Sequence, residues 1–177
     1  MNKKVLIAGL VLVLPLIALL AMSFGRDPHA VRSPLVGKQA PPFALTTVRG
    51  TGDVPQLSLE ALAGKPAVVN FWATWCQPCQ MEHGVLTRGA KMFGDKVQFV
   101  GIVYEDEEPA ILDFLGRYGS GYPALLDHGG KTAIAYGVTG VPETFFIDAS
   151  GKIVSKYAGP LSPDLLAQHV RGLLESR

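Results

Sequence analysis

The feature that most constrains this chain is its single pair of cysteines, Cys76 and Cys79, which are separated by two residues. A disulfide with this spacing closes so short a loop that it adds little to stability. A nearly continuous apolar run, residues 66–72, comes just before the pair and is typical of a central strand buried on both faces. A helical pattern follows from Cys76 to about Ala90. The sequence therefore predicts a strand, a reactive cysteine pair and a helix in succession.

Disulfide exchange is the chemistry that fits a cysteine at the beginning of a helix. The unpaired N–H groups and the partial positive charge of a helix N-terminus stabilise a thiolate at Cys76, and the thiolate is the attacking form. Cys79, one turn further on, is placed to attack the mixed disulfide and release the partner. Pro78 suits the first helical turn, and Trp75 is expected to cover one side of the sulfurs. Cys76 and Cys79 are the predicted catalytic residues, and Trp75 and Pro78 are supporting residues.

A metal site is the main alternative for a C-x-x-C motif. Zinc would need two further ligands, and no H-x-x-x-H pair exists among the four histidines, His29, His83, His128 and His169. His83 stands only four residues after Cys79, so a loose metal site or a copper-chaperone role remains a competing hypothesis. We expect neither a metal nor an organic cofactor, only a redox-active disulfide between Cys76 and Cys79.

The rest of the pattern alternates strands and helices. After the first strand and helix, the sequence predicts a strand at 97–103, helices at 107–118 and 131–136, strands at 144–148 and 153–157, and a last helix that begins at 162–164. Ser58 is a candidate cap for a short helical turn through Ala63. A βαβ unit followed by a hairpin and a closing helix implies a mixed sheet with helices on both faces. The predicted fold class is α/β, in the thioredoxin-like arrangement.

The N-terminal residues predict a membrane segment. Residues 5–22 contain no charge and are long enough to cross a bilayer, and Lys3 and Lys4 precede them. These features suit an uncleaved signal-anchor or a cleaved secretory signal, and the length of the run favours the anchor. Either interpretation exports the rest of the chain, and a buried core helix is the remaining alternative. We assign residues 1–25 to the signal-anchor, 26–42 to a Pro-rich linker and 43–177 to the thioredoxin-like domain.

A second motif, Gly140-Val141-Pro142-Glu143-Thr144, lies just before the strand at 144–148. In a thioredoxin-like fold the proline at this place is cis, packs against the C-x-x-C motif and leaves the preceding backbone free to pair with a bound peptide. Cis peptide bonds are rare, and the alternative is an ordinary trans proline at a strand edge. We expect the cis form, which makes Val141 and Pro142 supporting site residues.

The segments WATWCQPC, residues 72–79, and GVPETFFID, residues 140–148, resemble the cytochrome c maturation thioredoxins of bacteria, the CcmG or DsbE family. The resemblance spans about residues 37–159. The segment Met81-Glu82-His83 narrows it from thioredoxin-like proteins in general to this family. The resemblance implies a periplasmic domain anchored in the inner membrane by residues 5–22. It also implies a dithiol reductant that acts on apocytochrome c or on haem-attachment components before haem is attached. A membrane thiol transporter of the DsbD or CcdA type is the implied electron donor.

Two carboxylates are candidates for proton transfer. Typical thioredoxins carry an Asp where this chain has Asn70, and an amide cannot titrate as that Asp does. Glu82 and Glu143 are the replacements we expect, because their motifs place one beside the helix and the other beside the cis proline. The alternative is that both are surface carboxylates. Thr139 stands where some family members carry Tyr, which leaves the details of substrate contact open.

The charge pattern limits the partners. The chain carries 16 Lys and Arg against 15 Asp and Glu and has no long basic run, so we expect no nucleic-acid partner. The acidic stretch at residues 105–108, followed by Pro109, favours a helix start, while the family implies a partner surface near this loop.

Other functions remain compatible with these motifs. A general extracytoplasmic reductase and an oxidant would use the same cysteines, and the reduction potential separates reductants from oxidants. The alternative that is not an enzyme is a non-catalytic module that binds apocytochrome or a metal. Such a module would keep its function in Cys76→Ser, whereas an exchange enzyme would lose it.

Overall fold

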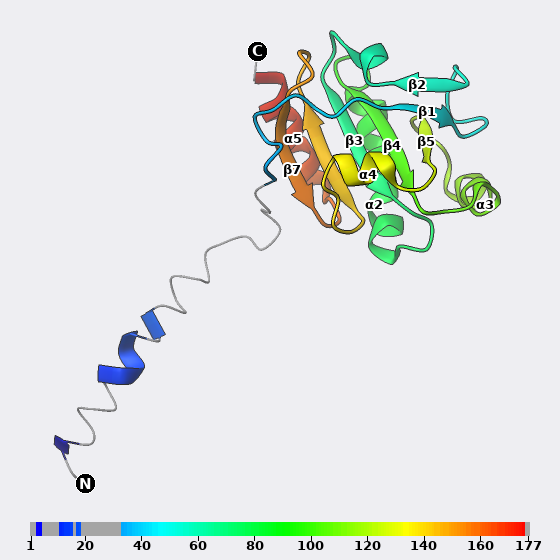
Figure 1. Cartoon of the computed structure of the whole chain (residues 1–177). Coiled ribbons are helices and arrows are strands. Elements are labelled where there is room, and N and C mark those ends of the chain that lie inside the picture. Colours follow the sequence, from blue (N-terminus) through cyan, green and yellow to red (C-terminus); the bar gives the residue numbers. More distant parts are fainter. Residues whose placement is uncertain (1–2, 5–10, 16, 19–32, 176–177) are drawn as a thin grey trace. The chain divides into compact units, whose positions relative to one another are not determined.

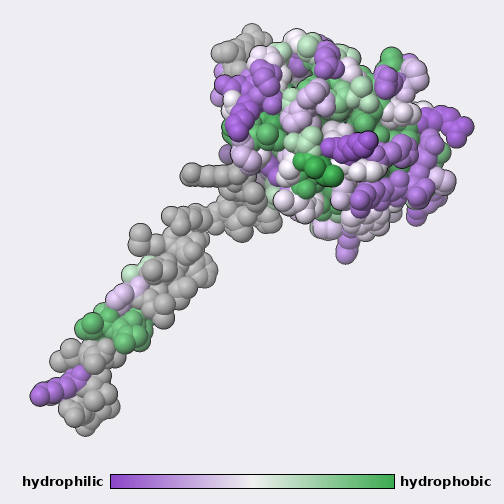
Figure 2. All heavy atoms as spheres, viewed as in Figure 1, coloured by the Kyte–Doolittle hydropathy of each residue, from purple (hydrophilic) through white to green (hydrophobic). Residues whose placement is uncertain are grey.

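The computed structural model describes residues 3–4, 11–15, 17–18 and 33–175, and its contacts divide the chain into two units, residues 1–30 and 31–177. In the first unit the described residues are helical, and the side chains of residues 11–14 are apolar and exposed (Figure 2). Within the described ranges, no helix is both long and apolar enough to cross a membrane. Much of the expected anchor, residues 5–22, lies outside the described residues, and the anchor stays a prediction.

In the described part of the second unit, seven strands form one mixed sheet with the order β2-β1-β5-β4-β3-β6-β7 (Figure 1). The strands are β1 (Ala44–Thr47), β2 (Gln56–Ser58), β3 (Ala67–Trp72), β4 (Gln98–Tyr104), β5 (Ala124–Asp127), β6 (Glu143–Ile147) and β7 (Ile153–Ala158). At the centre, β4 is parallel to both β3 and β5. The outer pairs are antiparallel: β6 pairs with β3 and β7, and β1 pairs with β5 and β2. The expected mixed α/β sheet is confirmed.

Helices cover both faces of this sheet, as the sequence predicts. They are η1 (Glu60–Leu62), α2 (Gln77–Phe93), α3 (Glu108–Tyr118), α4 (Lys131–Ala135) and α5 (Pro163–Glu175). Helices α2 and α5 pack over Val68 of β3, and α3 packs over Trp72. Because side chains alternate along a strand, these three helices share one face. Helix α4 packs over Val69 and Phe71 on the opposite face (Figure 1).

The structure contains three strands that the sequence pattern does not predict. β5 has only four residues, all buried, and follows Pro123 directly, so it is too short to show a period. β1 and β2 form a pair at the edge of the sheet in which no residue is fully buried. Their sequences therefore lack the apolar signal that marks a central strand.

The segment 26–42, expected as a linker, contributes its described residues 33–42 to the folded unit. The N–H of Gly37 donates to the carbonyl of Ile153 at 2.8 Å, and the N–H of Ile153 donates to the carbonyl of Lys38 at 2.9 Å. The N–H of Ala40 donates to the carbonyl of Gly151 at 2.8 Å, and Ala40 is buried. The folded body thus includes residues before the expected start at residue 43.

Gly89 of α2 allows this helix to approach α5 closely. A Cβ added at Gly89 would lie 2.6 Å from Cδ2 of Leu166 and 3.3 Å from a ring carbon of Phe99. Leu166 and Phe99 are both buried, so neither has much room to move. A glycine inside a helix is otherwise unfavourable, and here the close packing explains it.

We expect Gly89→Ala to lower the free energy of unfolding by about 1–2 kcal/mol, because overpacking a filled core outweighs the better helix propensity of Ala. Gly116→Ala in α3 is the matched control, since nothing lies within 4 Å of its added Cβ. The control should gain up to about 1 kcal/mol. Urea denaturation measures both, and an equal gain in the two variants would contradict the packing argument.

Candidate active site

The cysteine pair lies where β3 ends and α2 begins. Cys76 is the N-cap residue of α2, with an extended backbone, and the backbone N–H of Cys79 donates to its Sγ at 3.2 Å. Pro78 occupies the first turn, as expected. Cys76 and Cys79 are joined by a disulfide, and both are buried. The predicted sequence of strand, cysteine pair and helix is confirmed, and the positive end of the helix faces Cys76.

The loop before β6 closes over the cysteine pair. The Val141–Pro142 peptide bond is cis, which confirms the expectation from the second motif. The carbonyl oxygen of Val141 lies 3.4 Å from Sγ of Cys76. Residues that are far apart in the sequence therefore meet at one point, and the backbone next to the cis proline borders the sulfur that would attack a substrate.

Trp75 is 59% exposed and is held by the acidic loop that follows β4. Its indole N–H donates to the carbonyl oxygen of Glu105 at 3.0 Å, and the N–H of Thr74 donates to Oδ2 of Asp106 at 2.6 Å. The loop thus fixes the turn that carries the cysteines, a role that the sequence did not reveal. The same stretch starts α3 at Glu108, so the expected helix start is confirmed. That Trp75 covers the sulfurs stays a prediction.

Glu82 is a buried carboxylate with only 1% of its surface exposed, so the surface alternative is wrong for this residue. Its Oε1 accepts a hydrogen bond from Nδ2 of Asn70 at 2.8 Å, and its Oε2 accepts one from the N–H of Leu161 at 2.7 Å. Burial raises the pKa of Glu82 to about 7, although the hydrogen bonds from Leu161 and Asn70 partly oppose the rise. Glu82 can therefore bind or release a proton near neutral pH.

Asn70 links this carboxylate to the strand that follows the cis proline. Its Nδ2 donates to Oγ1 of Thr144 at 3.0 Å as well as to Glu82. Glu82 also lies three residues after Cys79 on α2, where side chains of successive turns are neighbours. The titratable group therefore comes from the helix, while the amide on β3 orients it. The sequence gives no signal for the contacts of Thr144 and Leu161. Thr144 contributes a hydroxyl that is distant in the sequence, and Leu161 contributes a backbone N–H.

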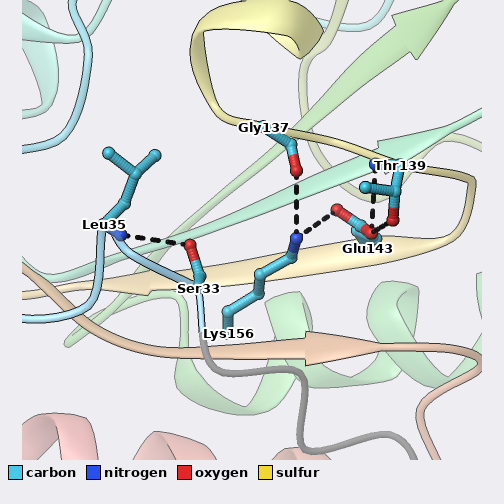
Figure 3. Close-up of polar contacts among 6 residues, drawn as sticks. All are labelled: Ser33, Leu35, Gly137, Thr139, Glu143 and Lys156. Carbon is cyan, nitrogen blue, oxygen red and sulfur yellow. Dashed lines mark hydrogen bonds and ion pairs between the residues drawn. The ribbon is translucent and has the colours of Figure 1, made fainter.

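Glu143 is also buried, with 2% of its surface exposed, so it is not a surface carboxylate either. Its Oε2 lies 2.7 Å from Nζ of Lys156, and its Oε1 accepts hydrogen bonds from the N–H and Oγ1 of Thr139 at 3.3 and 2.8 Å (Figure 3). Thr139 therefore contacts Glu143 of the second motif, a contact that the sequence did not reveal. Lys156 was missed, because a single lysine in a short strand is ordinarily a surface residue.

His83 is occupied by a structural contact. Its Nε2 lies 2.9 Å from the carbonyl oxygen of Gly119, and its ring packs against the rings of Trp72 and Phe114. Burial lowers the pKa of His83, and the contact with Gly119 partly offsets that shift. Among the described residues, no group of three or more His, Cys, Asp or Glu side chains is arranged to hold a metal ion.

Several known proteins are similar to this chain in sequence and in fold. The Redoxin family model matches residues 35–171. The thiol:disulfide interchange protein DsbE of Allochromatium vinosum is 38% identical to this chain, over 91% of this chain and 87% of that protein. The chain belongs to the redoxin family, in its DsbE group. The thiol:disulfide interchange protein HelX of Rhodobacter capsulatus is also 38% identical, over 84% of this chain and 82% of that relative.

Solved structures agree with this assignment to the DsbE group. A thiol:disulfide interchange protein of the thioredoxin family from Chlorobium tepidum superposes with a TM-score of 0.69 and 31% identity, over 77% of this chain and 95% of that one. A secreted Mycobacterium tuberculosis disulfide oxidoreductase gives 0.65 and 31%, over 74% and 96% of the two chains. The fold is thioredoxin-like, and the protein is a thiol–disulfide oxidoreductase.

The raised pKa of Glu82 predicts how stability depends on pH. Between pH 4.5 and about 7 the native carboxyl keeps a proton that the unfolded chain releases. The unfolded state therefore binds fewer protons, and stability falls as the pH rises through this window. Across this window the free energy of unfolding of wild type should fall by about 3 kcal/mol through Glu82. Glu82→Gln should not show this fall.

Urea unfolding of the oxidised protein at several pH values between 4.5 and 8 measures this difference. Glu175→Gln, at an exposed position on α5, is the matched control and should keep the wild-type pH dependence. Parallel pH profiles for wild type and Glu82→Gln would show that folding does not raise the pKa of Glu82, which contradicts the assignment.

Proposed function

We propose that this protein is a dithiol reductant of cytochrome c maturation, which reduces disulfides in apocytochrome c or in the haem-attachment components that act on it. The similarity to DsbE and HelX supports this proposal, together with the WATWCQPC and GVPETFFID motifs. Haem can then be attached to free cysteines of the apocytochrome. A general extracytoplasmic disulfide reductase is the alternative that uses the same residues.

In the proposed reaction, Cys76 and Cys79 give two electrons and two protons to the substrate disulfide. The thiolate of Cys76 attacks one substrate sulfur, the substrate S–S bond breaks, and the other substrate sulfur leaves and takes up a proton. Cys79 then loses its proton, attacks Sγ of Cys76 and releases the second substrate thiol. The products are two substrate thiols and the Cys76–Cys79 disulfide that the structure contains.

Glu82 is the proposed acceptor for the proton of Cys79. It is the neighbour of Cys79 on the next turn of α2, both residues are buried, and the pKa of Glu82 is raised to about 7. A base with a pKa near the working pH is the most effective in such a step. Asn70 holds the carboxylate in place by its hydrogen bond to Oε1.

The similarity to the DsbE group supports the proposed direction of electron flow, while the surroundings of Cys76 act on its thiolate in opposite ways. The described contacts of its Sγ are one N–H, from Cys79, and one carbonyl oxygen, from Val141. Strong oxidants of this type owe their power to a stabilised reduced form. Here the helix N-terminus and the N–H of Cys79 stabilise a thiolate at Cys76, whereas the carbonyl oxygen of Val141 opposes it.

We further propose that the protein is held in the bacterial inner membrane through residues 5–22, with its folded unit in the periplasm. The uncharged apolar run after Lys3 and Lys4 supports this location. In that oxidising compartment the spent disulfide needs an electron donor. A membrane thiol transporter of the DsbD or CcdA type is the proposed donor.

A trapping experiment tests the substrate. In Cys79→Ala the mixed disulfide between Cys76 and its partner cannot be resolved, so the partner should stay attached and be identified by mass spectrometry of membranes. We expect apocytochrome c or a haem-attachment component. Cys76→Ala is the control, because it lacks the attacking thiol and should trap nothing.

The other results of this experiment are also informative. A broad set of exported proteins on Cys76 would favour the general reductase. Trapping of no partner at all by Cys79→Ala would contradict the exchange mechanism and favour a non-catalytic binding module.

A further inference from the structure

Lys156 and Glu143 form a buried ion pair close to the cysteines. Nζ of Lys156 lies 2.7 Å from Oε2 of Glu143, and the two side chains are only 2% and 3% exposed (Figure 3). Lys156 reaches this position from β7, the outermost strand on its side of the sheet, and Glu143 is the first residue of β6. Burying two charges costs free energy, and an apolar pair often serves stability as well. The pair therefore calls for a reason other than stability.

The contacts of the pair converge on one loop, residues 137–142, which connects α4 to β6. Nζ of Lys156 donates to the carbonyl oxygen of Gly137 at 3.3 Å. Oε1 of Glu143 accepts from the N–H and the Oγ1 of Thr139 at 3.3 and 2.8 Å. Lys156 thus links Gly137, at the beginning of the loop, to β7. Glu143 links Thr139, in the middle of the loop, to the first residue of β6 (Figure 3).

Between these ties the loop carries the atoms that border the reactive sulfur. The carbonyl oxygen of Val141 lies 3.4 Å from Sγ of Cys76, and the cis Pro142 follows it. Hydrogen bonds join Thr139 to the side chain of Glu143. Only three residues, 140–142, lie between them. A shift of Lys156 would release Gly137 and leave the Glu143 carboxylate buried without its cation.

We propose that Lys156 is a positioning residue for disulfide exchange: through Glu143 and Gly137 it fixes the loop 137–142, so that the Val141 backbone meets a substrate peptide beside Cys76. Lys156 does not touch the sulfurs or the substrate. Its amine also lies 5.1 Å from the centre of the Phe145 ring, a cation–π contact that holds it toward the loop. The inference rests on thiol–disulfide exchange at Cys76 and not on which protein is the substrate.

This role predicts a difference between large and small substrates. A peptide disulfide needs the Val141 backbone as well as the thiolate, whereas 2-hydroxyethyl disulfide needs the thiolate alone. In the full-length protein, Lys156→Met should slow reduction of a cyclic peptide disulfide at least tenfold. Reduction of 2-hydroxyethyl disulfide should change less than twofold. Lys152→Met, at an exposed position of the same hairpin, is the matched control and should leave both rates unchanged.

A second variant separates positioning from the effect of an uncompensated buried charge. Glu143→Gln combined with Lys156→Met leaves no buried charge at this place, so its thermal unfolding should return toward that of wild type. It still lacks the tie between β7 and Gly137, and its peptide reduction should stay at least fivefold slow. Equal slowing of the peptide and the small disulfide in Lys156→Met, or wild-type peptide rates in the double variant, would overturn the inference. Either result would refute the role of Lys156 and would not affect the conclusion that wild type catalyses disulfide exchange at Cys76.

Discussion

The antiparallel pairing of β6 with β3 is the constraint on which the site depends. Its register places Glu143 opposite Phe71 and Thr144 opposite Asn70. The end of β3 leads within a few residues to Cys76, and the start of β6 is preceded directly by the cis Pro142. This pairing therefore brings the C-x-x-C motif and the cis-proline loop to the same end of the sheet. A shift of one residue would turn every side chain of β6 to the other face and separate the two motifs.

Two buried carboxylates flank this meeting point, and their surroundings give them different properties. Glu82 accepts hydrogen bonds from two neutral groups, the amide of Asn70 and the N–H of Leu161, so burial dominates and raises its pKa to about 7. Glu143 faces the ammonium group of Lys156, which balances its charge. One carboxylate is thus suited to carry a proton, and the other is suited to hold a loop. This division of roles depends on one lysine and one amide placed on opposite sides of the site.

Much of the fold could be predicted because its signals are local. The strand before Cys76, the helix after it and the hairpin at 144–157 are each marked by apolar runs, caps or turn residues next to one another in the sequence. β5 was missed because four residues show no period, and β1 and β2 because none of their residues is fully buried, so their sequences contain no continuous apolar run.

The candidate site shows the same limit. Cys76, Cys79 and the cis Pro142 come from motifs, whereas the burial of Glu82 and its bond to Leu161 arise only when α5 folds back onto α2. The hairpin that places β7 beside β6 is predicted from the sequence, but the burial of Lys156 and its pairing with Glu143 depend on the exact strand register, which the sequence pattern does not contain.

The reduction potential of the Cys76–Cys79 pair tests the proposed direction of electron flow most directly. It can be measured at pH 7 by equilibrating the protein with defined ratios of reduced and oxidised glutathione or dithiothreitol and trapping the free thiols. A dithiol reductant needs a potential well below about −200 mV, and this is the value that the proposed function predicts for the pair. A value near about −120 mV, typical of strong oxidants, would contradict the reductant function.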